Sequence, residues 1–81
     1  MGNREFGEYL RSMREAKGLS QFQLGKMVGV SDKAVSKWEN GYANPTNIFI
    51  PRLSKLFGVS TDELFDKMYS SGKKEKTEIG K

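Results

Sequence analysis

Two lysines four residues apart, Lys33 and Lys37, are the side chains whose type and spacing most directly suggest a chemistry. On the outward side of a helix, both ammonium groups can donate to O6 and N7 of guanine. Their neighbours add other base-reading chemistry, because Asp32 can accept from cytosine N4, Ser36 can donate or accept, and Ala34 can pack on a thymine methyl group. The alternative is an ordinary solvated helix face, since most surface lysines contact only water.

The composition excludes several other kinds of site. The chain of 81 residues contains neither cysteine nor histidine, which removes disulfides, Cys/His zinc sites and the usual nucleophile–base pairs of enzymes. We therefore predict no metal, no cofactor and no enzymatic activity. No apolar run approaches the about 18–20 residues that span a bilayer, and the N-terminal segment lacks the apolar region of a signal peptide. These features predict a cytoplasmic protein without membrane contact.

The formal net charge of +4 is compatible with a polyanionic partner such as nucleic acid. Half of that charge lies in residues 70–81, where four lysines accompany two glutamates. The remaining excess is small, so charge alone does not distinguish a nucleic-acid-binding domain from any other soluble domain.

Two short predicted helices would position the polar residues. One is expected over residues 20–28 and the other over residues 31–40, each opening on a serine that can act as N-cap. Gly29 can adopt the left-handed conformation that a tight turn between them needs. Two helices joined by such a turn form a helix-turn-helix, whose second helix enters the major groove of DNA with its N-terminal part.

Apolar residues and one further glycine are expected to hold this helix pair at its angle. Gly25 would leave space where the two helices come closest. Trp38 is assigned to the core rather than to base stacking, because it follows Val35 by three residues on the same helical face. The residues predicted to face inward are Leu24, Met27, Val28, Val30, Val35 and Trp38.

Three more helices complete the prediction, over residues 4–17, 46–57 and 60–68. Pro51 lies inside the fourth and disfavours helix at the residue before it, so we expect a tight first turn and a break near Ile50. Thr46 would cap the fourth helix, and Ser60 with Glu63 would form a capping box on the fifth. The predicted fold is all-α, a compact five-helix bundle over residues 1–69, followed by a disordered basic tail over 70–81.

Several sequence segments carry a family resemblance, namely Gly18–Gln21, Gly29–Ser31, Ser36–Gly41, Pro45 and Leu56–Leu64. In this order and spacing, within residues 5–66, they resemble the Cro/cI-type (XRE-like) helix-turn-helix regulators of bacteria and phages. The resemblance implies a lambda-repressor-like DNA-binding domain that acts as a dimer on a palindromic operator in double-stranded DNA.

The resemblance also implies roles for individual residues. Arg14 and Glu39 would form a partly buried ion pair that links the first helix to the third. Phe22 departs from the family pattern, in which this position is often charged, and it would pack either on a neighbouring chain or over its own surface. By the resemblance, the base-facing residues are Asp32, Lys33, Ser36 and Lys37, and the phosphate-contacting residues are Gln21 and Asn40. From side-chain chemistry and position we add Ala34 as a base-facing candidate and Ser31 and Tyr42 as phosphate-contacting candidates.

The fifth helix offers candidates for a dimer interface. Its apolar residues are Leu64, Phe65, Met68 and Tyr69, which form more apolar surface than one small domain needs to cover. The alternative is that they close the core of their own chain.

The function predicted from these observations is sequence-specific regulation of transcription, with repression as the expected mode. A second hypothesis keeps the same fold as a protein-interaction module, such as an antitoxin or an anti-repressor. The small net charge and the acidic Asp32 favour that alternative. DNA binding is favoured by four other residues, Gln21, Lys33, Lys37 and Asn40.

Overall fold

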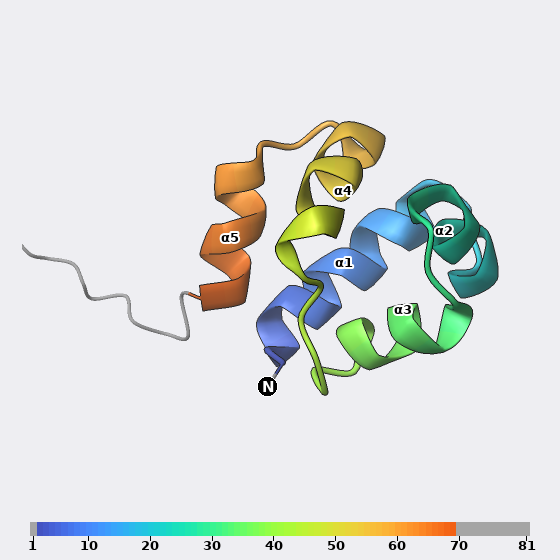
Figure 1. Cartoon of the computed structure of the whole chain (residues 1–81), viewed down its shortest axis with the longest axis horizontal. Coiled ribbons are helices and arrows are strands. Elements are labelled where there is room, and N and C mark those ends of the chain that lie inside the picture. The colour runs from blue at the N-terminus through green and yellow to red at the C-terminus, as the bar shows by residue number, and fades with distance from the viewer. Residues whose placement is uncertain (1, 70–81) are drawn as a thin grey trace, which may run out of the picture.

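Five α-helices and one 3-10 turn form the part of the chain that the structure, a computed structural model, describes, which is residues 2–69 (Figure 1). They are α1 (Arg4–Ala16), α2 (Gln21–Val28), α3 (Asp32–Glu39), η1 (Asn47–Phe49), α4 (Ile50–Phe57) and α5 (Thr61–Tyr69). The prediction of an all-α, five-helix fold is confirmed. The tail predicted over residues 70–81 lies outside the described residues.

Serine side chains begin three of the helices, as predicted. The Ser31 hydroxyl accepts from the amide of Ala34 at 3.1 Å and so caps α3. Ser20 caps α2 and forms a full capping box with Gln23, which the sequence analysis did not identify. The box predicted for Ser60 is only half formed: its hydroxyl accepts from the Glu63 amide, but the Glu63 carboxylate accepts from the Tyr9 hydroxyl of α1.

The predicted break in the fourth segment is present. Residues 47–49 form the 3-10 turn η1, and α4 then starts at Ile50 with Pro51 in its first turn, where a missing amide proton costs nothing. Thr46 makes no side-chain hydrogen bond to the following amides, so the prediction that it caps this segment is wrong.

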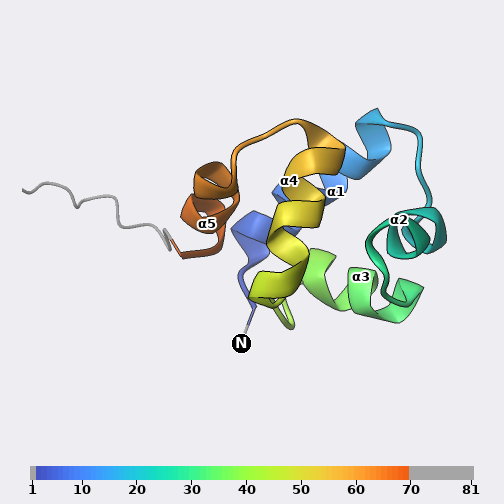
Figure 2. The same ribbon diagram turned by 45° about the horizontal axis from the view of Figure 1, so that its top comes forward.

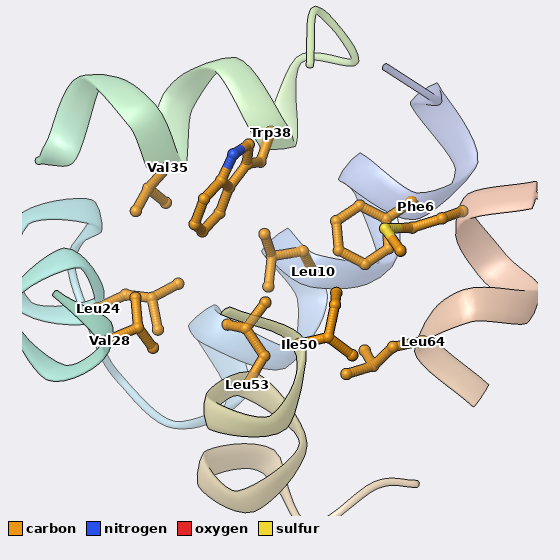
Figure 3. Close-up of a cluster of buried hydrophobic side chains, with 10 residues drawn as sticks. Phe6, Leu10, Leu24, Val28, Val35, Trp38, Ile50, Leu53 and Leu64 are labelled. Atoms are coloured by element: carbon orange, nitrogen blue, oxygen red, sulfur yellow. The ribbon is translucent and has the colours of Figure 1, made fainter. Parts of the chain in front are cut away.

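Ten buried apolar side chains from all five α-helices form one core (Figure 3). The members are Phe6, Leu10, Leu24, Val28, Val35, Trp38, Ile50, Leu53, Leu64 and Met68. The prediction that Met27 faces inward is wrong, because its side chain is 56% exposed. Leu24 and Val28 are one helical turn apart and share the inner face of α2, which leaves Met27 about 100° away from Val28.

α2 and α5 lie at opposite ends of the bundle, with α1 and α4 between them (Figures 1 and 2). The side chain of Asn3, which caps α1, also donates to the carbonyls of Lys67 and Met68 at 3.1 and 2.8 Å. This contact fixes the start of α1 to the end of α5. Within residues 2–69, no helix is long and apolar enough to cross a membrane.

Candidate nucleic-acid interface

The turn between α2 and α3 depends on two glycines. Gly29 has φ +94°, and its amide donates to the Gly25 carbonyl at 2.7 Å. A Cβ atom on Gly25 would lie 2.5 Å from the carbonyl oxygen of Val30, which is closer than Cβ atoms approach other heavy atoms in real structures. The left-handed turn that the sequence predicted is therefore present. The space left by Gly25 is occupied by the backbone of the turn, at Val30 and Ser31, rather than by α3 itself.

Side chains from three helices fix the angle of this helix pair. Val35 and Trp38 of α3 are buried against Leu24 of α2, as predicted (Figure 3). Arg52 of α4 adds a contact that the sequence analysis missed, because its Nη1 donates to the Val28 carbonyl at 2.9 Å. No sequence motif marks this arginine, since its partner is a backbone atom 24 residues away.

The outward face of α3 carries the charged candidates for base contact. Asp32, Lys33 and Lys37 are exposed, whereas Ala34 and Ser36 are half-buried. Ala34 packs against the core, and the Ser36 hydroxyl accepts from the side chain of Asn40 at 3.2 Å. Asp32 and the two lysines are therefore more accessible to a ligand than Ala34 and Ser36.

The four candidates for phosphate contact lie in different surroundings. Gln21 is the first residue of α2, and its Nε2 donates to Oε1 of Glu39 at 3.0 Å. Ser31 uses its hydroxyl as an N-cap, and Asn40 is exposed at the C-terminal end of α3. Tyr42 is 74% exposed in the loop that follows. Ser31, Asn40 and Tyr42 are therefore exposed, whereas Gln21 is half-buried.

Arg14 and Glu39 form a buried ion pair between α1 and α3. Nε of Arg14 lies 2.6 Å from Oε2 of Glu39, and Nη2 donates to Oε1 at 3.1 Å. The side chains are only 10% and 1% exposed, and the hydrogen bond to Glu39 raises the pKa of Arg14 above its ordinary value. Gly7 permits this contact between the helices, since a Cβ there would lie 2.3 Å from the Glu39 carbonyl oxygen. The sequence analysis did not identify this role of Gly7.

Charge is distributed unevenly along the bundle. Residues 17–55 contain six lysines and arginines and only two acidic residues, one of which is the buried Glu39. α5, at the other end, carries Asp62, Glu63 and Asp66 against a single Lys67. Residues 17–55, which hold α2, α3 and most of α4, therefore carry a net charge of +4 (six minus two), and this positive region is the part of the chain suited to a polyanion.

The candidate dimer residues of α5 divide into two pairs. Leu64 and Met68 are buried in the core of their own chain, at 0% and 3% exposure, so they are not free to contact a second chain. Phe65 and Tyr69 stack on each other with ring centroids 6.2 Å apart, and Tyr69 is 65% exposed. An interface on α5 would thus involve Phe65 and Tyr69.

Acidic residues do not gather into a metal site within residues 2–69, where no group of three potential ligands is close enough to hold an ion.

Comparisons with known proteins also identify a helix-turn-helix in this part of the chain. A sequence model described as helix-turn-helix matches residues 10–64. The chain is 43% identical over 60 residues to the HTH-type transcriptional activator BcrR of Enterococcus faecalis, covering 74% of this chain and 29% of that protein. It is 39% identical over 64 residues to repressor protein C2 of Salmonella phage P22, covering 79% of this chain and 30% of that protein. The chain thus spans less than a third of the length of each of these relatives.

Structural similarity extends to a protein–DNA complex. The P22 c2 repressor, in complex with a synthetic operator, superposes with a TM-score of 0.69 at 41% sequence identity. The match covers 73% of this chain and 89% of that chain. The sequence comparison and the structural comparison thus both find the P22 repressor.

Proposed function

This chain belongs to the helix-turn-helix family of DNA-binding transcriptional regulators, and from that premise we propose that α3 enters the major groove of double-stranded DNA and recognises a specific sequence. Lys33 and Lys37 would donate to guanine, and Asp32 would accept from cytosine N4. Gln21, Ser31, Asn40 and Tyr42 would hold the flanking phosphates.

One observation carries this proposal. α3 is held to the core by Val35 and Trp38 and to α2 by the Gly29 turn, while Lys33 and Lys37 stay exposed on its other side. A rigid helix with exposed donors and a buried back is the geometry that base reading in a groove requires. The net positive charge of residues 17–55, which include this helix, would draw it to the phosphates.

Repression is the mode that we favour. A protein that occupies an operator blocks other proteins from the same DNA, so repression requires only the binding surface described above. P22 C2 is a repressor and BcrR an activator, so the domain itself is compatible with both modes. The protein would act in the cytoplasm, on bacterial or phage DNA.

We also propose that two copies bind together on a palindromic operator. Tyr69, which is 65% exposed, and the half-buried Phe65 stacked on it would supply the aromatic surface for a symmetric contact, at the end of the bundle away from α2. Sedimentation with and without DNA measures this association. A monomer at every concentration, both free and on DNA, would exclude the dimer and leave the mode of DNA binding untouched.

The experiment that tests DNA binding compares random duplexes with duplexes selected from a random pool, each titrated at several salt concentrations. Phosphate contacts release counterions, so affinity should fall steeply with salt for both kinds of duplex. The K33A/K37A variant should lose sequence preference, because each base contact of this kind contributes about 1–3 kcal/mol of discrimination. Lys67→Ala, at the opposite end of the bundle, is the matched control and should keep the preference.

The rival hypothesis of a protein-interaction module makes the opposite prediction. Under it, K33A/K37A would leave the biological effect intact, and neither the parent chain nor the control would prefer any duplex. Binding without salt dependence, or no binding to any duplex, would refute the proposed function.

A further inference from the structure

Two hydrogen bonds join Ser36 to Asn40, one helical turn further along α3. The backbone amide of Asn40 donates to the Ser36 carbonyl at 2.9 Å, and Nδ2 of its side chain donates to the Ser36 hydroxyl oxygen at 3.2 Å. The first bond closes the last turn of the helix, at whose C-terminal end Asn40 lies. The backbone of Asn40 is therefore fixed, and its side-chain amide is held against the Ser36 hydroxyl.

The bond from Asn40 leaves the Ser36 hydroxyl with two free directions. A serine oxygen has one hydrogen and two lone pairs, which occupy three staggered positions around the Cβ–Oγ bond. The Asn40 N–H takes one of these positions, and a lone pair must face it. The hydroxyl hydrogen is thus confined to one of the remaining two positions.

No acceptor on the helix itself takes this hydrogen. Helical serines often donate to a carbonyl three or four residues earlier, but within residues 2–69 no hydrogen bond donated by Ser36 is found. Ser36 is also half-buried, so a ligand against α3 would exclude water from it. A donor kept dry without an acceptor is costly, so the hydrogen is satisfied only when the ligand supplies the acceptor.

We propose that Asn40 positions the Ser36 hydroxyl as a hydrogen-bond donor and so makes Ser36 a residue that determines sequence specificity. Ser36 selects a base edge that presents an acceptor, such as guanine O6 or thymine O4, and rejects the amino groups of cytosine and adenine. By residue type alone, serine can read either kind of edge. This inference rests on the proposed insertion of α3 into the major groove.

Asn40 can position Ser36 while it contacts a phosphate. Nδ2 carries two N–H groups, of which Ser36 takes one. The Asn40 side chain is exposed, so the second N–H can donate to a phosphate oxygen, which only accepts. A phosphate contact therefore keeps Nδ2 on the side of the DNA and of Ser36. It also couples the reading of this base to the register of α3 on the DNA backbone.

The test compares base preferences of the parent, S36A and N40A by selection from a random duplex pool, followed by titration of duplexes changed at single base pairs. S36A should lose a preference of about two- to tenfold at one base pair, which is the contribution of one neutral hydrogen bond. N40A keeps the hydroxyl but should weaken that same preference, because water can then accept from Ser36. N40A should also weaken binding to all duplexes by a common factor, through the lost phosphate contact.

N40D should reverse the preference, since a carboxylate can only accept. The new carboxylate should take the Ser36 hydrogen and turn a lone pair toward the base, which favours an amino group there by about two- to tenfold. Asn47→Asp adds the same charge at an exposed residue of η1 and is the matched control, which should keep the parent preference. S36A/N40D should show no preference at this base pair. Thermal unfolding of each variant verifies that it is folded.

Each outcome decides between the inference and its alternatives. If the parent selects a site and S36A keeps every preference, Ser36 reads no base and this inference is wrong, while the proposed function stands. If S36A loses a preference that N40D does not reverse, Asn40 does not set the direction of the hydroxyl and the inference is overturned. A reversal that also occurs in N47D would come from charge alone and would overturn it too. If the parent binds no duplex, the proposed function fails and this inference fails with it.

Discussion

Replacement of Glu39 by glutamine should destabilise the fold more than any other isosteric change of a carboxylate in residues 2–69. The Glu39 side chain is 1% exposed and lies 2.6 Å from Nε of Arg14, which is itself 10% exposed. In E39Q the guanidinium would remain buried without its counter-charge. Removal of one partner of a buried ion pair costs about 3–5 kcal/mol.

That cost is large compared with the stability of a domain of this size. Native domains are stable by about 0.05–0.15 kcal/mol per residue, which gives on the order of 3–10 kcal/mol here. E39Q would therefore remove a third or more of the free energy of unfolding. Trp38, which is 5% exposed and adjacent to Glu39, provides a fluorescence signal for urea unfolding. With a slope of about 1 kcal/mol per molar urea, the loss of about 3–5 kcal/mol should lower the urea midpoint by about 3–5 M.

Two further variants decide whether burial is the cause. E15Q removes an exposed carboxylate that also contacts Arg14, at 4.0 Å, and should change the free energy of unfolding by less than about 0.5 kcal/mol. R14M/E39L removes both charges and should regain most of the stability that E39Q loses. A midpoint for E39Q that matches that of E15Q would refute the argument that the pair is buried and mutually dependent.

The remaining predictions concern contacts away from this pair. Gly25→Ala should lower the free energy of unfolding in urea by about 1–3 kcal/mol, because the new Cβ would lie 2.5 Å from the Val30 carbonyl oxygen. Alanine by itself favours a helix over glycine, so a stabilised variant would contradict the close approach at Gly25. Arg52→Met should cost about 1 kcal/mol by leaving the Val28 carbonyl without its donor, and an unchanged urea midpoint would show that this contact has no energetic role. Burial and the hydrogen bond to Glu63 raise the pKa of Tyr9 from 10.0 to about 12. The folded state thus holds the Tyr9 proton more tightly than the unfolded state. The contribution of Tyr9 to the free energy of unfolding should therefore be constant below pH 10 and should fall between pH 10 and about 12. Tyr9→Phe should not show this fall in stability. An identical pH dependence of unfolding in the parent and the variant would contradict the raised pKa of Tyr9.

The sequence was sufficient to predict features that depend on local chemistry. Helix starts at Ser20 and Ser31 follow from side-chain capping, and the left-handed turn follows from Gly29. The break before Pro51 follows from the missing amide proton. The core positions of Val35 and Trp38 follow from helical periodicity. Each of these depends on neighbours a few residues away in the chain.

Features that depend on distant parts of the chain were missed or misjudged. Met27 was placed inside because it is apolar, but the direction of α2 relative to the core decides its exposure. Arg52 contacts a carbonyl of another helix, and Gly7 is required by the path of α3 past α1. None of these relations leaves a periodic or local signal in the sequence.

The central claim is that α3 reads base edges in the major groove. The most direct test is guanine methylation interference on a duplex selected from a random pool. Methylation at N7, which lies in the major groove, should block binding of the parent chain at defined guanines, and K33A/K37A should lose that pattern. Interference confined to adenine N3 in the minor groove, or selection that enriches no sequence, would contradict the account.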